Sequence, residues 1–404
     1  MARQPGCTLQ LLKTGLVGAG VIPAKVIGRQ IGSIYSGGVT MSEQVYDFGF
    51  GVDANYVKYA GVLMTNLVLQ HPGRQLHFHL ACDGINEEDR QRLDTFIKLY
   101  RNVELYIYDL KKVLDQLNPV CKDTPKRLNR SVLLKILLPA YVPQEIERLV
   151  YMDVDVICCR RLDELFSMDL QGKVIAAVLD TNSRKNAAAL GLKHSRYYFS
   201  GMMVFDLPAW NGRQTTGRIT DYYQQHSERL IFLEQDALNA VVNGAFADLD
   251  KRYNFLIEVN NPLMIKYPEN VAVLHCVNEA KAWTKGCLPE IRELYWQYVR
   301  QSLWNDLQPV EPTTVKAAFL AAATAELQGD YEQARRYYVQ VINGFTEYYK
   351  NKSPVLLQVV RQECLKAAAA EKQGKTAQAI AAYGAAAQRF TEQYLNDNPE
   401  FLNR

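Results

Sequence analysis

The stretch Leu149-Val150-Tyr151-Met152-Asp153-Val154-Asp155-Val156-Ile157 decides the fold prediction for this chain. A short apolar segment, typical of a buried strand, runs into two aspartates separated by one residue. Alternate residues of a strand point to the same side, so we expect Asp153 and Asp155 to project together. Neighbouring carboxylates repel each other, and a hard divalent cation such as Mg²⁺ or Mn²⁺ removes that conflict. The alternative is a strand end with two solvated acids, and the surrounding sequence must distinguish the two.

Composition limits the possible functions. The 404-residue chain is long enough for two or three domains and a large core. Its 46 basic and 43 acidic residues leave a formal net charge of +3, so we expect no nucleic-acid partner. The eight cysteines have neither the density of a disulfide scaffold nor the paired spacing of a zinc site. Reduced thiols and a cytoplasmic location are the resulting expectations.

Three regions follow one another along the chain. Residues 1–40 are expected to form an extension of unknown role. Its apolar run Leu16–Ile22 is too short to span a bilayer. Residues 41–307 alternate between strand and helix patterns, which predicts an α/β domain with a mainly parallel sheet. Ligands of such sheets bind beyond the carboxyl ends of strands, where Asp53 and Asp153 lie. The expected strands are 46–52, 76–82 and 103–108, and the expected helices are 56–70, 86–100 and 131–141.

The last region, residues 313–404, contains an internal repeat. Ala325–Ala334 recurs as Ala370–Ala379 after an offset of 45 residues, and each copy contains one glycine. A helix, a glycine turn and a second helix with small residues are typical of tetratricopeptide-like hairpins. We therefore expect a helical domain after the linker 308–312.

Four further segments of the chain, together with the segment that contains the two aspartates, form five blocks that occur in the same order as in glycosyltransferase family 8, and the sequence resembles that family. The blocks are Gly51–Tyr56, Leu149–Asp155, Tyr198–Val204, Glu234–Asn239, and Leu274-His275 through Lys281-Ala282-Trp283. Members of this family are retaining, metal-dependent nucleotide-sugar transferases with a Rossmann-like GT-A fold. The resemblance covers about residues 45–300, and it implies that fold for the 41–307 domain.

The resemblance implies a metal site and a catalytic group. Asp153, Asp155 and His275 match the metal ligands, and an imidazole ligand suits Mn²⁺ better than Mg²⁺. Lys281 matches a lysine that contacts the diphosphate of the donor, where a cation stabilises the departing group. Gln235 matches a glutamine at the reactive face of the donor sugar. Gln235, Lys281 and Asp153 are therefore the residues expected to take part in catalysis.

Other matched positions are expected to bind the donor. They are Asp53, Asn55, Tyr56, Lys135, Asp153, Val154, Asp155, Ser200, Gly201, Glu234, Gln235 and Lys281. Three positions depart from the family pattern. Lys135 stands where arginine is common, Glu234 where aspartate is more usual, and Phe199 where many relatives have asparagine. Lysine keeps the charge of arginine but lacks its planar fork, so altered donor geometry is expected.

The leading hypothesis is transfer of a hexose from UDP-galactose or UDP-glucose to a glycan or lipid-linked glycan, with retention at the anomeric carbon. A lipopolysaccharide or lipooligosaccharide core, or another surface glycan, is the expected acceptor, reached at the inner face of the membrane. The alternatives are a nucleotide-sugar-binding interaction protein and a self-glucosylating enzyme similar to glycogenin.

The helical domain carries two clusters that join basic and aromatic residues. Arg335–Tyr338 and Tyr348–Lys352 could place it on an anionic membrane surface or against a protein partner. The alternative is that the tyrosines pack between the hairpins while the cations remain solvated.

Overall fold

A computed structural model describes the chain in four stretches, which are residues 44–117, 130–257, 269–277 and 281–397. Within them the chain forms two compact units. The first consists of residues 44–117, 130–255, 269–275 and 301–305. The second consists of residues 256–257, 276–277, 281–300 and 306–397. The extension 1–40 lies outside the described residues, and the domain limits 41–307 and 313–404 stay predictions. No helix within the described stretches is long and apolar enough to cross a membrane.

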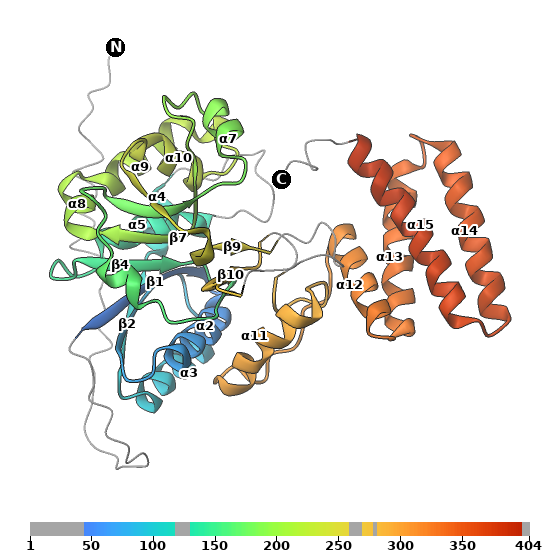
Figure 1. Cartoon of the computed structure of the whole chain (residues 1–404), viewed down its shortest axis with the longest axis horizontal. Coiled ribbons are helices and arrows are strands. Elements are labelled where there is room, and N and C mark those ends of the chain that lie inside the picture. Colours follow the sequence, from blue (N-terminus) through green and yellow to red (C-terminus); the bar gives the residue numbers. More distant parts are fainter. Residues whose placement is uncertain (1–43, 118–129, 258–268, 278–280, 398–404) are drawn as a thin grey trace. The chain divides into compact units, whose positions relative to one another are not determined.

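The first unit is built on a seven-stranded sheet with the order β3-β2-β1-β4-β7-β6-β8 (Figure 1). Its strands are β1 (Val45–Asp53), β2 (Gln75–Asp83), β3 (Val103–Asp109), β4 (Arg148–Met152), β6 (Ile175–Leu179), β7 (Tyr198–Asp206) and β8 (Phe246–Leu249). Strand β7 runs antiparallel to β4 and to β6, and the other neighbouring strands are parallel. The predicted α/β domain with a mainly parallel sheet is confirmed.

A small second sheet has the order β5-β10-β9. Its strands are β5 (Val156–Cys158), β9 (Phe255–Leu256) and β10 (Val273–His275). Strand β5 is fixed to a helix by Asn66, whose side chain donates to Cys158 O at 2.9 Å and accepts from Cys158 N at 2.7 Å. Because this amide is buried, both of its bonds are shielded from water. The end of β5, three residues after Asp155, is therefore fixed to this helix.

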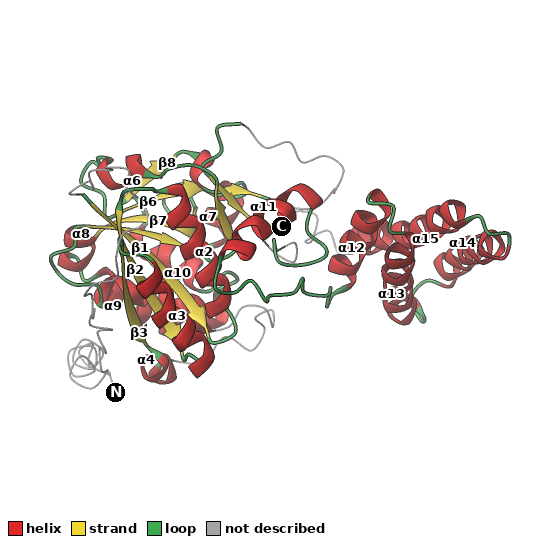
Figure 2. Ribbon diagram, turned by 90° about the horizontal axis from the view of Figure 1, so that it is seen from below, coloured by secondary structure: helices red, strands yellow, loops and turns green. Residues whose placement is uncertain are grey.

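Helices cover the large sheet (Figure 2). They are α2 (Val57–Gln70), α3 (Glu87–Leu99), α4 (Lys111–Gln116), α5 (Leu134–Leu137), α6 (Asp163–Ser167), α7 (Ser183–Ala189), α8 (Leu207–Gly212), α9 (Thr215–His226) and α10 (Glu234–Val242). The strands and helices expected from 46 to 108 are confirmed to within one residue at each end. The segment expected as a helix at 131–141 is helical over residues 130–140, but it is not one regular α-helix. Only one α turn forms, between two 3₁₀ turns, because Pro139 has no N–H for a longer helix.

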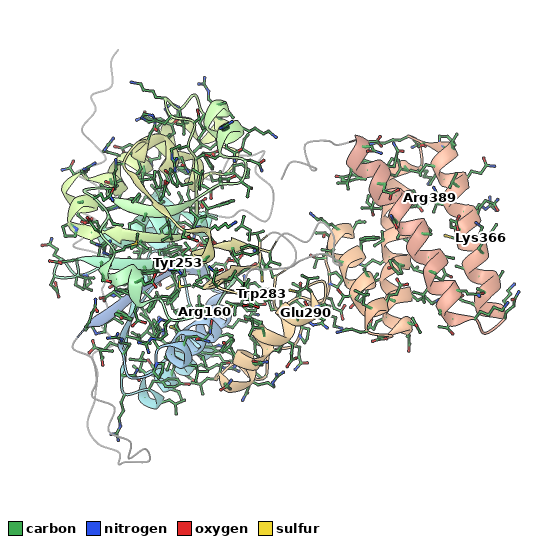
Figure 3. All side chains as sticks on the ribbon, viewed as in Figure 1. Arg160, Tyr253, Trp283, Glu290, Lys366 and Arg389 are labelled. Carbon is green, nitrogen blue, oxygen red and sulfur yellow. The ribbon has the colours of Figure 1, made fainter. Side chains whose placement is uncertain are left out.

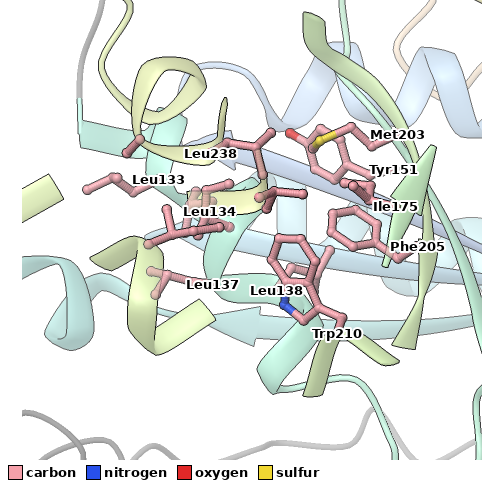
Figure 4. Close-up of a cluster of buried hydrophobic side chains, with 14 of the residues drawn as sticks. Leu133, Leu134, Leu137, Leu138, Tyr151, Ile175, Met203, Phe205, Trp210 and Leu238 are labelled. Carbon is pink, nitrogen blue, oxygen red and sulfur yellow. The ribbon is translucent and has the colours of Figure 1, made fainter. Parts of the chain in front are cut away.

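This broken helix packs closely on β1. A Cβ atom on Gly51 would lie 2.9 Å from Leu134 Cβ and 3.4 Å from Lys135 N, so only glycine permits the approach. Figure 4 shows Leu134, Leu137 and Leu138 in the same buried apolar cluster as Tyr151. The apolar contacts hold the segment against the sheet, and Lys135 is thereby placed at the end of β4.

The second unit is helical, with α11 (Pro289–Gln301), whose last residue belongs to the first unit, and α12 (Val315–Leu327), α13 (Tyr331–Tyr349), α14 (Pro354–Lys372) and α15 (Thr376–Asp397). Helices α12 and α13 form one hairpin, α14 and α15 form the other, and α15 lies between α13 and α14 (Figure 1). The repeated glycines close the first helix of each hairpin, because Gly329 and Gly374 have φ of 75° and 70°, the left-handed region that favours glycine. The predicted helix–glycine turn–helix pattern is confirmed.

The basic and aromatic clusters of this unit make internal contacts. Tyr337, Tyr338 and Tyr349 are buried, and their hydroxyls donate to Glu311, Glu326 and Asp397. Arg335 and Arg336 form ion pairs with Glu371 and Glu311. These contacts favour tyrosine packing between the hairpins, although the arginines are paired as well as partly solvated. A membrane or protein contact through the helical domain stays a prediction.

Candidate active site

The two aspartates of the central motif lie between the two sheets. Strand β4 ends at Met152, Asp153 follows directly, and Val154 and Asp155 occupy a turn before β5. The expectation that both aspartates project from one strand was therefore wrong. The pairing of β4 with β7 ends at Met152↔Met202, and Asp153 N then donates to Gly201 O at 2.8 Å as the chain leaves the large sheet. The turn nevertheless brings the two carboxylates together.

His275 reaches the aspartates through the small sheet. Strand β10 pairs antiparallel with β5 and places His275 opposite Val156, the residue after Asp155. His275 Nε2 lies 3.0 Å from Asp155 Oδ1. One ligand atom each from Asp153, Asp155 and His275 lies within 4.8 Å of the other two, so this group can hold a metal ion.

A buried amide orients the imidazole. His275 Nδ1 lies 2.8 Å from Asn254 Oδ1, which accepts a hydrogen bond and thereby assigns the ring proton to Nδ1. Nε2 then faces Asp155 with its lone pair. Two electron donors 3.0 Å apart are stabilised by a cation, and a histidine held through its other nitrogen is the usual arrangement in metal sites. The donor set of two carboxylates and one imidazole fits a divalent cation, Mn²⁺ better than Mg²⁺.

Gly201 makes room for this ring. A Cβ atom built on Gly201 would lie 2.3 Å from His275 Cε1, 2.9 Å from His275 Nδ1 and 3.2 Å from Asp153 Oδ2. These distances are shorter than atomic contacts allow, so any side chain at this position would displace His275. The glycine matched by the family resemblance therefore has a steric role in the ligand group.

Lys135 lies beneath the aspartates as a buried counter-charge. Its Nζ is 2.9 Å from Asp153 Oδ1 and 3.3 Å from Glu234 Oε1. Burial alone would lower the pKa of Lys135, but the charges of Asp153 and Glu234 outweigh it and raise that pKa above its ordinary value. Burial also raises the pKa of Glu234, and Lys135 opposes this. Tyr151 donates to Asp153 Oδ1 at 3.0 Å. Asp153 is therefore held by two side chains in addition to its backbone.

Ser200 and Gln235 form the next part of the site. Gln235 Oε1 accepts from Ser200 N at 2.9 Å and from Ser200 Oγ at 3.2 Å, while its Nε2 donates to Tyr197 at 3.2 Å. Tyr197 in turn donates to Asp236 Oδ1 at 2.6 Å. Both ends of the Gln235 amide are thus fixed, which suits a group that positions or polarises a substrate rather than a covalent nucleophile.

Backbone strain precedes this glutamine. Leu233 has φ of 44°, an unfavourable conformation for a branched side chain, and lies directly before Glu234. The second oxygen of Asp236 accepts from Ile231 N at 2.7 Å and from Phe232 N at 2.8 Å, and these bonds hold the strained turn. Asp236 is therefore more than an acid in the first turn of α10, because it fixes the turn that delivers Glu234 and Gln235.

The other residues expected to bind the donor come from several different parts of the chain. Asp53 is the last residue of β1, and Asn55 and Tyr56 follow it. Because β1 runs parallel to β4, these residues lie at the same edge of the sheet as Asp153. Asp53 Oδ1 accepts from Asn55 N at 2.8 Å, and Tyr56 is 38% exposed. The side chain of Val154 is buried, so only its backbone is available to a ligand. Lys281 belongs to the second unit, and its place in the site stays a prediction.

The structure adds three residues that the sequence did not reveal. Tyr151, Tyr197 and Asn254 bind Asp153, Gln235 and His275. Tyr151 lies within the quoted motif, but its strand pattern predicts only burial. Tyr197 adjoins a matched block, whereas nothing around Asn254 indicates a partner on another strand.

Comparison with known proteins identifies a family and a fold. The model of the family described as "Glycosyl transferase family 8" matches residues 49–287. A lipopolysaccharide 1,3-galactosyltransferase of Salmonella typhimurium is 22% identical over 310 residues, covering 73% of this chain and 89% of that protein. A lipopolysaccharide 1,2-glucosyltransferase of Escherichia coli is 23% identical over 286 residues, covering 68% of this chain and 83% of that protein.

Solved structures agree on the fold. The galactosyltransferase LgtC, solved with donor and acceptor sugar analogues, superposes with a TM-score of 0.53 at 19% identity, covering 64% of this chain and 96% of LgtC. The bifunctional glycosyltransferase WbbM superposes with a TM-score of 0.54 at 15% identity, covering 66% of this chain and 52% of WbbM. The expected GT-A fold is confirmed.

Proposed function

Because the chain belongs to glycosyltransferase family 8, we propose that it transfers a hexose from a UDP-sugar to a glycan with retention at the anomeric carbon. Family membership makes it a glycosyltransferase, and the donor, the metal and the acceptor are the proposed parts. The observation that carries the proposal is the convergence of Asp153, Asp155 and His275 between the two sheets. UDP-galactose or UDP-glucose is the proposed donor, since the two lipopolysaccharide transferases above take their names from these sugars.

The residues of the site are proposed to have different roles in binding the metal and the donor. Asp153, Asp155 and His275 would hold the divalent cation, which when bound neutralises charge on the donor diphosphate. Lys135 orients Asp153 through their ion pair. Gln235, with its amide fixed by Ser200 and Tyr197, would lie against the donor sugar. Lys281 would add a positive charge near the departing UDP. Asp53, Asn55 and Tyr56 would bind the nucleoside at the end of β1.

The proposed acceptor is a surface glycan such as a lipopolysaccharide or lipooligosaccharide core, by analogy with the names of the two relatives. Transfer at the cytoplasmic face of the membrane is the matching proposal for location. Family membership favours an enzyme over the alternative of a binding protein. Self-glucosylation stays a prediction, and the intact mass of the protein before and after incubation with UDP-glucose would reveal it.

The test is UDP release from a panel of UDP-sugars, measured with Mn²⁺ and again after chelation. Release from one donor that stops on chelation and returns with Mn²⁺ supports the proposal and identifies the sugar. Asp155→Ala should reduce release at least about a hundredfold, because it removes one of the three proposed metal ligands. Glu88→Ala is the control, since that carboxylate is exposed and forms an ion pair with Arg92 on the same helix. Release that is indifferent to chelation and to Asp155→Ala would refute the metal assignment.

A further inference from the structure

The turn that contains Lys281 is bonded to the segment that precedes the helical hairpins. Lys281 O accepts from Thr284 N and Thr284 Oγ1, each at 2.8 Å, which closes the turn. Val310 N donates to Trp283 O at 2.8 Å, and Lys285 N donates to Val310 O at 3.0 Å. These bonds form a parallel bridge between two stretches of the second unit (Trp283 is marked in Figure 3). The stretch 308–312, expected as a linker, is therefore part of the structure that fixes this turn.

Glu311 connects the same turn to helix α13. Its Oε1 lies 2.5 Å from Lys285 Nζ, and its Oε2 accepts from Arg336 at 2.7 Å and from Tyr337 at 2.5 Å. Burial alone would raise the pKa of Glu311, but the bonds from Lys285, Tyr337 and Arg336 outweigh it and lower that pKa to about 2. The carboxylate is therefore ionised at neutral pH, and it binds one cation from the turn and another from the helix.

Helix α12 contacts the turn as well. A Cβ atom on Gly286 would lie 2.9 Å from Ala317 O in the first turn of α12, so the two backbones approach as closely as glycine allows. Arg292 donates to Lys285 O at 3.1 Å and to Gln328 at 3.3 Å, which joins the turn to the end of the same helix. Contacts at both ends of α12 and on α13 thus converge on the residues that follow Lys281.

We infer that the helical domain positions Lys281, with Glu311 and Lys285 as the positioning residues. The inference rests on the proposed function, in which the Lys281 ammonium meets the donor diphosphate. A long flexible side chain binds well only if its backbone is held in place, since binding otherwise has to fix that backbone as well. The helical domain then contributes to donor binding through contacts within the second unit, whatever else it binds.

The experiment measures the dissociation constant of UDP in the presence of Mn²⁺ for the full chain. Glu311→Gln keeps the shape of the side chain and removes its charge, and Lys285→Met removes the cation on the other side of the bond. Each is expected to weaken UDP binding about fivefold, a modest loss because both groups are partly exposed. Glu371→Gln is the matched control, since it breaks the ion pair with Arg335 in the same helical domain without touching the turn, and UDP affinity should stay unchanged.

A double substitution separates positioning from a general effect on folding. In a Lys281→Ala background, Glu311→Gln is expected to cause no further loss of UDP affinity, because it acts through the lysine. Thermal unfolding confirms that each variant is folded. Additive losses, equal losses in Glu371→Gln, or full affinity in both Glu311→Gln and Lys285→Met would overturn the inference while leaving the proposed function intact. Absence of UDP binding by the unaltered chain would overturn both.

Discussion

Lys135 and Glu234 form a buried ion pair beside the aspartate motif, with Lys135 Nζ 3.3 Å from Glu234 Oε1 and both side chains 7% exposed. Asp153 completes the group, 2.9 Å from the same ammonium. Both residues depart from the family pattern. Lys135 is shorter than the usual arginine, and Glu234, its partner, is longer than the usual aspartate. The Lys135 ammonium neutralises charge on both carboxylates. A substitution at any one of the three residues therefore changes the electrostatic energy of the other two.

The first prediction concerns stability. Lys135→Met leaves Asp153 and Glu234 facing each other without a counter-charge, so the free energy of unfolding should fall by about 3–5 kcal/mol. Adding Glu234→Leu should recover part of that loss, because one of the two uncompensated charges is removed. Urea denaturation of the single and double variants measures both changes. Lys366→Met is the control, since its pair with Glu363 lies on the surface and should cost less than about 1 kcal/mol. Equal costs at the two lysines would contradict the prediction.

The second prediction concerns compensation between the two side chains. Glu234→Asp shortens the acid and opens a gap, and Lys135→Arg forces a larger group into a filled site, so each single change should lower kcat/KM about tenfold. Together they should restore kcat/KM to within about threefold of the original enzyme, because the total reach is conserved. Steady-state kinetics of the four proteins measures this. A double variant as poor as the product of the two single losses would show that the residues act independently.

The third prediction tests the steric role of Gly201. Gly201→Ala should push the His275 ring out of the ligand group, since the added Cβ would lie 2.3 Å from Cε1. The dissociation constant for Mn²⁺ is expected to rise at least about tenfold. Isothermal titration with Mn²⁺ gives the value. Gly212→Ala is the matched control, because nothing lies within 4 Å of a Cβ there and its φ is not positive. Undiminished Mn²⁺ binding by Gly201→Ala would remove His275 from the site.

Local sequence patterns predicted the fold, because each element from β1 to β3 has its own periodicity and its own end signal. Tyr46 to Val52 alternate, and His71-Pro72-Gly73 close the helix before β2. The break at Pro139 was equally visible in the sequence, yet the run 131–141 was expected as one helix. Burial of its leucines against β1, made possible by Gly51, fixes a shape that no periodicity describes.

The sequence predicted which residues form the site, but not the contacts that hold them together. The family resemblance supplied Asp153, Asp155, His275 and Gln235, but the turn that joins Asp155 to β5 depends on pairing with β10 far along the chain. The contacts of Lys135 with Glu234 and of Asn254 with His275 depend on packing between elements distant in sequence. A single sequence contains no record of such pairs, so only the fold reveals them.

The fourth prediction concerns pH and Asp163. Hydrogen bonds from Arg161, and also from Tyr46 and Arg74, hold the pKa of Asp163 well below its usual range, although burial opposes them. A carboxyl whose pKa is lower in the folded state contributes its full stabilisation above its unfolded pKa of about 3.9, and this stabilisation is lost as the pH falls from that value toward the lower pKa of the folded state. Asp163→Asn should lower the Tm at pH 7, and the difference from the unaltered protein should shrink between about pH 4 and pH 2. A Tm difference that is constant over this range would contradict the assignment.

The fifth prediction concerns the residue that orients the imidazole. Asn254→Leu removes the acceptor 2.8 Å from His275 Nδ1, so the ring loses the bond that keeps Nε2 toward Asp155. The dissociation constant for Mn²⁺ should rise about tenfold to a hundredfold, as is usual when the partner of a ligand histidine is removed. Isothermal titration measures this without a sugar donor.

Asn254→Asp distinguishes orientation from packing. Its carboxylate accepts the same bond from Nδ1, so Mn²⁺ affinity should stay close to that of the unaltered protein, whereas leucine fills the space without accepting. Asn102→Leu serves as a control for asparagine loss elsewhere, since its side chain donates to the backbone carbonyl of Arg74, away from the ligand group. If aspartate and leucine weaken Mn²⁺ binding equally, the volume of Asn254 matters more than its oxygen. If neither does, His275 needs no second partner, and the ligand group is held by β5 and β10 alone.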